Sequence, residues 1–162
     1  MRFELLTYDQ KRRFLQRLHN RLNNMCFNGE LNQLKRIDID YVGGSDVGAA
    51  YGLRWVYNFE TLEDEMQMCI LFSPEFIDFI AELKKQSYQI YGLALYMHHE
   101  MIHQYCDENG IEDRESPDND HNQAWAKAAE EHGLSVQYDE DGKLEGQSSS
   151  AAELLSRTIR IR

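Results

Sequence analysis

The sequence predicts a single α+β domain over residues 1–162. Two long segments, 7–27 and about 86–107, repeat apolar residues at the spacing of amphipathic helices. Between them lie three short segments with strand-like patterns, at 36–42, 51–59 and 66–72. The length suits one domain with a sizeable core, and no internal repeat or interdomain linker divides the chain.

The first helix has a clear start and end. Thr7 is a suitable N-cap residue, and Gln10 follows three residues later, as in a capping box. Asn28 and Gly29 end the segment. The helix carries one apolar and one basic stripe, made respectively of Phe14, Leu18, Leu22 and Met25, and of Arg13, Arg17 and Arg21.

The three strand-like segments predict a small antiparallel sheet. Residues 36–42 alternate apolar and polar side chains, and residues 51–59 are rich in aromatic ones. Residues 66–72 form the apolar run of a buried strand. A flexible stretch rich in glycine and alanine, at 43–50, joins the first two.

Three helices are predicted after the sheet. The sequence SPEF at 73–76 places serine as N-cap and proline at the first helical position. A long helix follows from about Gln86 to Asp107, and a further helix covers 121–132 and stops at Gly133. The core stripe of the long helix comprises Ile90, Leu93, Met97, Met101 and Tyr105.

The domain core is expected over about 5–133. The C-terminal residues 134–162 are expected to form a hairpin around Asp141 and Gly142, followed by a tail that is partly loose.

The net charge of −11 is distributed unevenly along the chain. Residues 1–36 carry eight basic and three acidic residues, whereas residues 37–156 carry six and 25. The last six residues, RTIRIR, add three arginines. The acidic body disfavours broad nucleic-acid binding, because like charges repel the phosphate backbone. Only the basic first helix weakens that argument.

Cysteine usage and hydropathy predict a cytoplasmic protein. The three cysteines are odd in number and widely spaced, which indicates a reducing compartment and no disulfide framework. The N-terminus lacks the apolar segment of a secretory signal. No apolar run approaches the roughly 18 residues of a membrane helix, so no membrane partner is expected.

The chemistry of the chain concentrates in MHHEMIHQYC at 97–106, where His99, Glu100 and His103 form an HExxH motif. Residues four apart lie on the same face of a helix, so the two imidazoles can bind one metal ion. Zn²⁺ accepts neutral imidazole nitrogen and keeps an open position for water in catalytic sites. Glu100 lies about 100° around the helix, where it can act as general base toward that water.

Catalytic zinc needs a third protein ligand. The extended motif HExxHxxGxxH is excluded, because Cys106 and Asn109 occupy its glycine and histidine positions. His121 is the favoured ligand, since Asp118, Asn119 and Asp120 can cap the helix it opens and Trp125 can anchor that helix. Glu130 and Glu131 are the alternatives and would give a His₂Glu site.

Other polar residues receive structural interpretations. His98 is expected at the surface or behind the ligands, His19 at the surface, and Cys106 as a buried thiol. Tyr96 and Tyr105 are possible oxyanion partners. The acids between the long helix and residue 121 are expected to form a solvated loop rather than a calcium site; they are Glu112, Asp113, Glu115, Asp118 and Asp120.

Several short motifs resemble the SprT-like metallopeptidases, the family that includes Spartan. Asn23 begins an N-x-x-x-F-x-G-x-L signature that ends at Leu31, and ILFSPEF at 70–76 is similar to the family's I-x-L-S-P. HHEMIH and then HNQAW at 121–125 follow in order, with Asn122 where the family usually has glycine. The similarity covers roughly residues 5–133, without the paired cysteines of a zinc ribbon.

The resemblance implies a zincin-like α+β fold and zinc-dependent hydrolysis of peptide bonds in protein or peptide substrates. By that resemblance His99, His103 and His121 bind Zn²⁺ and Glu100 is catalytic. One alternative is a non-catalytic module of the same fold that binds zinc or a partner. Another is a nucleic-acid-associated protein that acts through the basic first helix.

Overall fold

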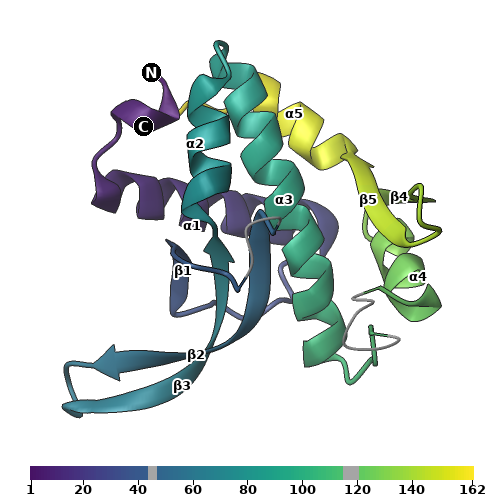
Figure 1. The fold of residues 1–162 in the computed structure, drawn as a ribbon, viewed down its shortest axis with the longest axis horizontal. Helices are drawn as coiled ribbons and strands as arrows, with labels where there is room; N and C mark the ends of the chain where they lie inside the picture. Colours follow the sequence, from purple (N-terminus) through teal and green to yellow (C-terminus); the bar gives the residue numbers. More distant parts are fainter. Residues whose placement is uncertain (44–46, 115–120) are drawn as a thin grey trace.

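The computed structural model describes residues 1–43, 47–114 and 121–162 and confirms the α+β class (Figure 1). None of the helices described is both long enough and apolar enough to cross a membrane. In chain order the elements are η1 (Phe3–Leu5), α1 (Tyr8–Cys26), β1 (Arg36–Ile39), β2 (Ala49–Asn58), β3 (Glu63–Phe72), α2 (Pro74–Glu82), α3 (Gln86–Glu108), α4 (Gln123–Glu131), β4 (Leu134–Tyr138), β5 (Leu144–Ser149) and α5 (Ser150–Thr158).

The main sheet is mixed, so the prediction of a purely antiparallel sheet is wrong. Its strand order is β1-β3-β2. β2 and β3 form an antiparallel hairpin, whereas β1 pairs with β3 in parallel. The chain passes from β1 to β2 at the opposite edge of the sheet, and β3 then lies between these two strands. A pattern of apolar residues reports burial but not which strand a segment will neighbour.

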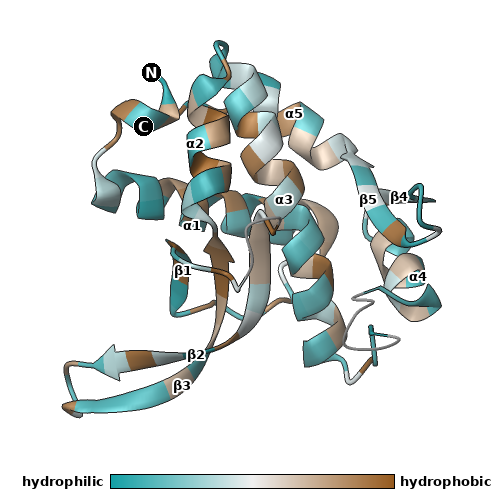
Figure 2. Cartoon of the chain, viewed as in Figure 1, coloured by the Kyte–Doolittle hydropathy of each residue, from teal (hydrophilic) through white to brown (hydrophobic). Residues whose placement is uncertain are grey.

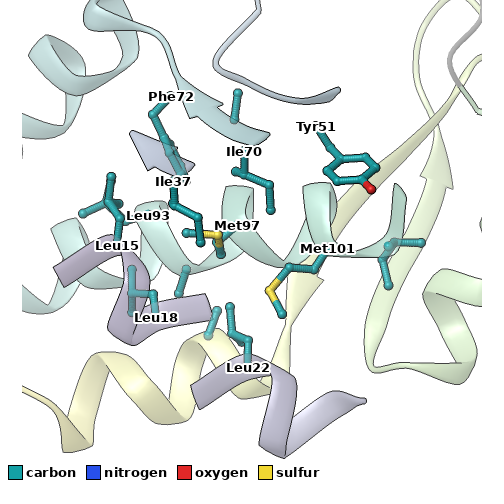
Figure 3. Close-up of a cluster of buried hydrophobic side chains, with 14 of the residues drawn as sticks. Leu15, Leu18, Leu22, Ile37, Tyr51, Ile70, Phe72, Leu93, Met97 and Met101 are labelled. Atoms are coloured by element: carbon teal, nitrogen blue, oxygen red, sulfur yellow. The ribbon is translucent and has the colours of Figure 1, made fainter. Parts of the chain in front are cut away.

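α3 is the central helix of the molecule. It contacts α1, α2, α4 and α5 as well as β2 and β5. Figure 3 shows the core between α1, α3 and the sheet, where Leu18 and Leu22 face Met97 and Met101. In Figure 2 the hydrophobic segments gather where these elements meet. Met25 departs from the predicted apolar stripe, because its side chain is 42% exposed.

The helix starts predicted at Thr7 and Ser73 are confirmed. Thr7 accepts a hydrogen bond from the Gln10 backbone N–H, and the Gln10 side chain caps the Thr7 N–H in return. At the start of α2 the Ser73 side chain accepts a hydrogen bond from the N–H of Phe76. These caps are local in sequence, which is why residue order alone predicts them.

The segment that follows α1 is held by a buried asparagine. Asn23 donates from Nδ2 to the Leu31 carbonyl and accepts from the Leu31 N–H, both at 3.0 Å. Its own carbonyl accepts from the N–H groups of Phe27 and Gly29. Asn23, Phe27, Gly29 and Leu31 are the named positions of the signature in the sequence, so that signature encodes one compact turn.

The C-terminal segment is ordered, so the expectation of a partly loose tail is wrong. The predicted hairpin is present as β4 and β5. α5 then contacts α3 and α1, and apolar side chains of α5 and of the residues after it join the core; these are Ala152, Leu155, Ile159 and Ile161. Arg17 donates to the carbonyl of Arg160 at 2.7 Å and so fixes the last residues against α1.

His19 is fully buried rather than at the surface. Gln104 uses its Nε2 to donate to Asn32 and Glu108, so its Oε1 accepts from His19 Nε2 at 2.8 Å. The second nitrogen, Nδ1, has no hydrogen-bond partner among the described residues. Burial therefore lowers the pKa of His19, and the imidazole is neutral in the folded protein.

This burial makes the free energy of unfolding pH-dependent. Because the folded pKa lies below the unfolded value of about 6.5, the unfolded chain binds the proton first as the pH falls. His19 should therefore not affect the free energy of unfolding at pH values well above about 6.5, and should lower it as the pH falls below that value. Urea unfolding of wild type and His19→Gln at two pH values on either side of it should show a smaller decline in the variant. Equal declines would assign the acid sensitivity to other groups.

Candidate metal centre

The three predicted histidine ligands come together in the structure. One ligand atom from each of His99, His103 and His121 lies within 4.8 Å of the others, close enough to hold one metal ion. His99 and His103 lie one turn apart on α3, and His121 precedes α4. Among the described residues no other group of His, Cys, Asp and Glu has this geometry.

The alternative carboxylate ligands lie elsewhere. Glu130 and Glu131 are exposed on the outer face of α4, and Glu131 pairs with Lys127 at 3.9 Å. Cys106 is fully buried as expected, and burial raises the pKa of its thiol to about 12, which keeps it protonated. Neither the thiol nor these carboxylates belong to the histidine cluster.

His121 lies just before the start of α4, which begins two residues later than predicted. Asn122 is the N-cap of α4, and its Oδ1 accepts from the Trp125 N–H at 3.0 Å. The predicted caps at 118–120 lie outside the described residues. Asn122 Nδ2 also donates to the Glu112 carbonyl at 2.8 Å. The asparagine thus ties the residues shortly after α3 to the helix that follows His121.

Two of the three imidazoles have a defined tautomer. His103 Nδ1 lies 2.6 Å from Oδ2 of Asp113, and His121 Nδ1 lies 2.6 Å from the carbonyl oxygen of Leu144. Each of these nitrogens must donate, because both partners are acceptors. A neutral imidazole protonated on Nδ1 carries a lone pair on Nε2. Both rings therefore present Nε2 as a ligand atom.

His99 is held by packing. Its Nε2 lies 3.0 Å from His121 Nε2. A Cβ added to Gly146 of β5 would meet His99 Nδ1 at 3.1 Å, so the absent side chain allows the strand to lie against the ring. Burial, and then the neighbouring His103, His121 and His98, hold the pKa of His99 well below its ordinary value. The ring is neutral, as a metal ligand must be.

Trp125 forms the floor beneath the three imidazoles. It is fully buried and stacks on His121, with ring centroids 4.0 Å apart. Its ring centroid lies 5.0 Å from that of His99 and 5.7 Å from that of His103. The predicted anchoring role of Trp125 is thus present in the structure, and the contacts also restrict rotation of the ligand rings.

The histidines face a cavity of about 380 Å³ between two strands. Glu100, which is 5% exposed, lines it together with Tyr96 from the same helix. One wall comes from Val47 and Gly48 with Ala49, the first residue of β2, and the opposite wall comes from Leu134, Glu145 and Gly146. Of the two tyrosines predicted as oxyanion partners, Tyr105 lies elsewhere, against His132, with ring centroids 4.2 Å apart.

The sequence patterns did not identify one residue that contacts the histidine cluster. Asp113 was assigned to a solvated loop, yet it binds a ligand histidine. The signal was available, since metal-binding histidines commonly donate their second N–H to a carboxylate. Of the two positions expected for His98, at the surface or behind the ligands, the surface one is wrong: His98 is fully buried, and its ring forms hydrogen bonds with Ser149 Oγ at 2.7 Å and the His132 carbonyl at 2.8 Å.

Comparison of the chain with protein-family models, with curated proteins and with solved structures finds no match. The resemblance to SprT-like metallopeptidases stays a prediction from the sequence motifs.

The first prediction for this site concerns the third ligand. His121→Ala should lower affinity for Zn²⁺ by more than the roughly 10–100-fold that follows loss of an outer-shell partner. Glu130→Ala and Glu131→Ala should leave that affinity unchanged, because both side chains lie outside the cluster. Titration against a competing chelator measures all three. A large loss in either glutamate variant with none in His121→Ala would refute the assignment.

A second prediction concerns Asp113. Asp113→Ala removes the acceptor that orients His103 and should weaken Zn²⁺ binding roughly 10–100-fold. Asp113→Asn keeps an oxygen acceptor and should lose less. The matched control is Glu112→Ala, an exposed neighbouring acid, which should bind as wild type does. If Asp113→Ala and Glu112→Ala bound Zn²⁺ with equal affinity, the proposed role of Asp113 in orienting His103 would be refuted.

Proposed function

We propose that the protein is a zinc metallopeptidase. The observation that carries this proposal is the meeting of three imidazole donors and a buried glutamate in one cavity beside an edge strand. Three protein ligands are the usual set of a catalytic zinc site, which keeps a further position for water or substrate. A purely structural zinc site usually has four protein ligands and needs no adjacent carboxylate.

The donor set fits Zn²⁺. His103 and His121 both present Nε2 because their Nδ1 atoms are engaged. The 3.0 Å between the Nε2 atoms of His99 and His121 is near the roughly 3.3 Å expected for two nitrogens on one tetrahedral zinc. Imidazole also suits copper, iron and nickel, so zinc is favoured here by the glutamate beside the site and by the family resemblance.

When bound, zinc polarises a carbonyl group and lowers the pKa of a water molecule. Glu100 follows His99 directly on α3 and lines the same cavity. In the proposed mechanism its carboxylate accepts a proton from the attacking water and later delivers it to the leaving amine. Tyr96 lines the cavity and is the remaining candidate for stabilising the developing oxyanion.

The cavity suits a polypeptide in extended conformation. β2 is an edge of the three-stranded sheet, and its first residue, Ala49, lies at the cavity wall. Gly48 lets the strand approach Tyr96, because a Cβ there would come within 2.6 Å of the tyrosine ring. A substrate backbone can add to such an edge through main-chain hydrogen bonds. An edge strand beside the helix of the HExxH motif also supports the zincin-like arrangement.

The decisive variant is Glu100→Gln. It should keep its fold and bind Zn²⁺, yet hydrolyse unfolded casein slower by at least roughly two orders of magnitude, the lower range for loss of a general base. The measurement is release of labelled peptides, with zinc content determined in parallel. Glu75→Gln, at an exposed position in α2, is the control and should retain activity.

Near-normal hydrolysis by zinc-loaded Glu100→Gln would remove Glu100 from the mechanism. The first alternative, a zinc-binding module without catalysis, predicts that wild type loaded with zinc cleaves none of a panel of unfolded proteins. The two functions therefore give different results in the same assay.

A second candidate function has its own observation. The hydrogen bond from Arg17 to Arg160 brings the two basic ends of the chain together. Arg13, Arg21, Arg160 and Arg162 are all exposed there, which gives a basic face on an acidic protein. Such a face suits the phosphates of a nucleic acid.

If this face binds duplex DNA, affinity should be measurable at roughly 50 mM salt and fall steeply as salt is raised. Arg13→Ala combined with Arg21→Ala should weaken binding and flatten that salt dependence. Arg17 is left intact because it holds the tail. Lys127→Ala on α4 is the control. Absence of binding by wild type at low salt would leave the arginines as a solvated face.

A further inference from the structure

The outer half of the β2–β3 hairpin carries an exposed apolar face. Figure 1 shows the two strands extending away from the helices. Leu53, Trp55 and Tyr57 alternate along β2 and are 53%, 67% and 46% exposed. Met66 lies opposite Trp55 on β3 and is 46% exposed. Large side chains at this exposure, in a row, form a patch rather than isolated surface residues.

This face is a continuation of the protein core. Side chains two apart on a strand share a face, so residues 49, 51, 53, 55 and 57 form one row. Ala49 and Tyr51 are buried within the core, and Tyr51 also bonds Asp107 of α3 at 2.7 Å. The strand then passes beyond the helix that covers it, and the same row becomes exposed.

The backbone edge of β2 is continuous with the candidate metal centre. Within the described residues β2 pairs only with β3, so its other edge has main-chain groups that can accept a further strand. The strand begins at the cavity wall, at Ala49, and runs to Asn58. At about 3.4 Å per residue, its exposed part from residue 53 onward is roughly 20 Å long.

The negative charge of the hairpin indicates which kind of polymer can bind to it. Residues 49–68 contain one basic residue, Arg54, against four acids, of which Glu60, Glu63 and Asp64 are exposed near the tip. Aromatic side chains can stack with nucleic-acid bases, but the acids would repel the phosphates. A basic polypeptide is instead favoured, because its cationic side chains are attracted to these acids.

We propose that the hairpin surface, meaning the free edge of β2 with Leu53, Trp55, Tyr57 and Met66, is an exosite for the substrate of the metal centre. It binds an extended polypeptide segment that flanks the scissile bond, with apolar side chains at alternate positions and basic residues between them. The link to cleavage rests on the proposed peptidase function. The surface favours unfolded, basic, apolar stretches, because a folded protein offers no extended backbone to the edge.

Binding is tested separately from catalysis with zinc-loaded Glu100→Gln. The probe is a fluorescein-labelled peptide of alternating valine and lysine, about 16 residues long so that it reaches from the cavity past Asn58. A peptide of alternating serine and lysine keeps the charge and removes the apolar side chains. Fluorescence anisotropy should give at least a roughly tenfold weaker Kd for the serine peptide.

The test variant adds Trp55→Thr and Tyr57→Thr, since threonine favours strands and both side chains are exposed. Its Kd for the valine peptide should rise at least roughly tenfold. Tyr41→Thr is the control, because Tyr41 is 70% exposed and follows β1 at the other edge of the sheet. An unchanged Kd in the Trp55 and Tyr57 variant would overturn the exosite.

Two other occupants give distinct results. Tighter binding of an oligothymidylate of about the same length, lost on substitution of Trp55 and Tyr57, would assign the surface to single-stranded nucleic acid. A dimer in analytical ultracentrifugation that dissociates in the same variant would assign it to a second copy of the chain. Either result would overturn the proposal.

Cleavage then separates this proposal from the proposed function. Wild type should cleave long valine–lysine peptides with a higher kcat/KM than peptides of about six residues, which end before Trp55. Substitution of Trp55 and Tyr57 should remove the advantage of length and leave short-peptide cleavage unchanged. Cleavage with no length advantage would overturn the exosite alone. Absence of any cleavage, with peptide binding retained, would overturn the peptidase function alone.

Discussion

The structure depends on satisfying the polar side chains buried along α3. Gln89, His98, His103 and Gln104 lie inside the molecule on a helix that is otherwise largely apolar. A buried polar group without a hydrogen bond costs about 1–3 kcal/mol, so each needs a partner. These partners come from distant segments, among them Phe3 near the N-terminus and Ser149 at the end of β5. The surrounding elements are thus positioned by hydrogen bonds to α3 as well as by the hydrophobic core.

Features encoded by local spacing were predictable from the sequence. The capping box at Thr7, the serine cap at Ser73 and the shared helical face of His99 and His103 each involve residues within four positions of one another. His121 was also inferred, because the donor had to come from another segment and few residue types can serve. Cys106 was expected to be a buried thiol, and it is fully buried.

Features that depend on distant partners were not predictable in the same way. Asp113 looks like one acid among several until the loop brings it to His103, and His19 looks exposed on a charged helix until Gln104 is placed beside it. The parallel pairing of β1 with β3 depends on the path between strands. The docking of α5 depends on a core that it completes. In each case the deciding contact lies outside any local window of sequence.

The dependence of His121 on β5 has a consequence for the newly made chain. The Leu144 carbonyl that orients His121 lies 23 residues further along, and the hydroxyl that holds His98 lies 51 residues beyond that histidine. At about 5–20 residues per second, a ribosome releases α3 seconds before β5. A nascent chain therefore has an HExxH helix before it has an oriented third donor. The order of synthesis therefore delays assembly of the histidine cluster until β5 has left the ribosome.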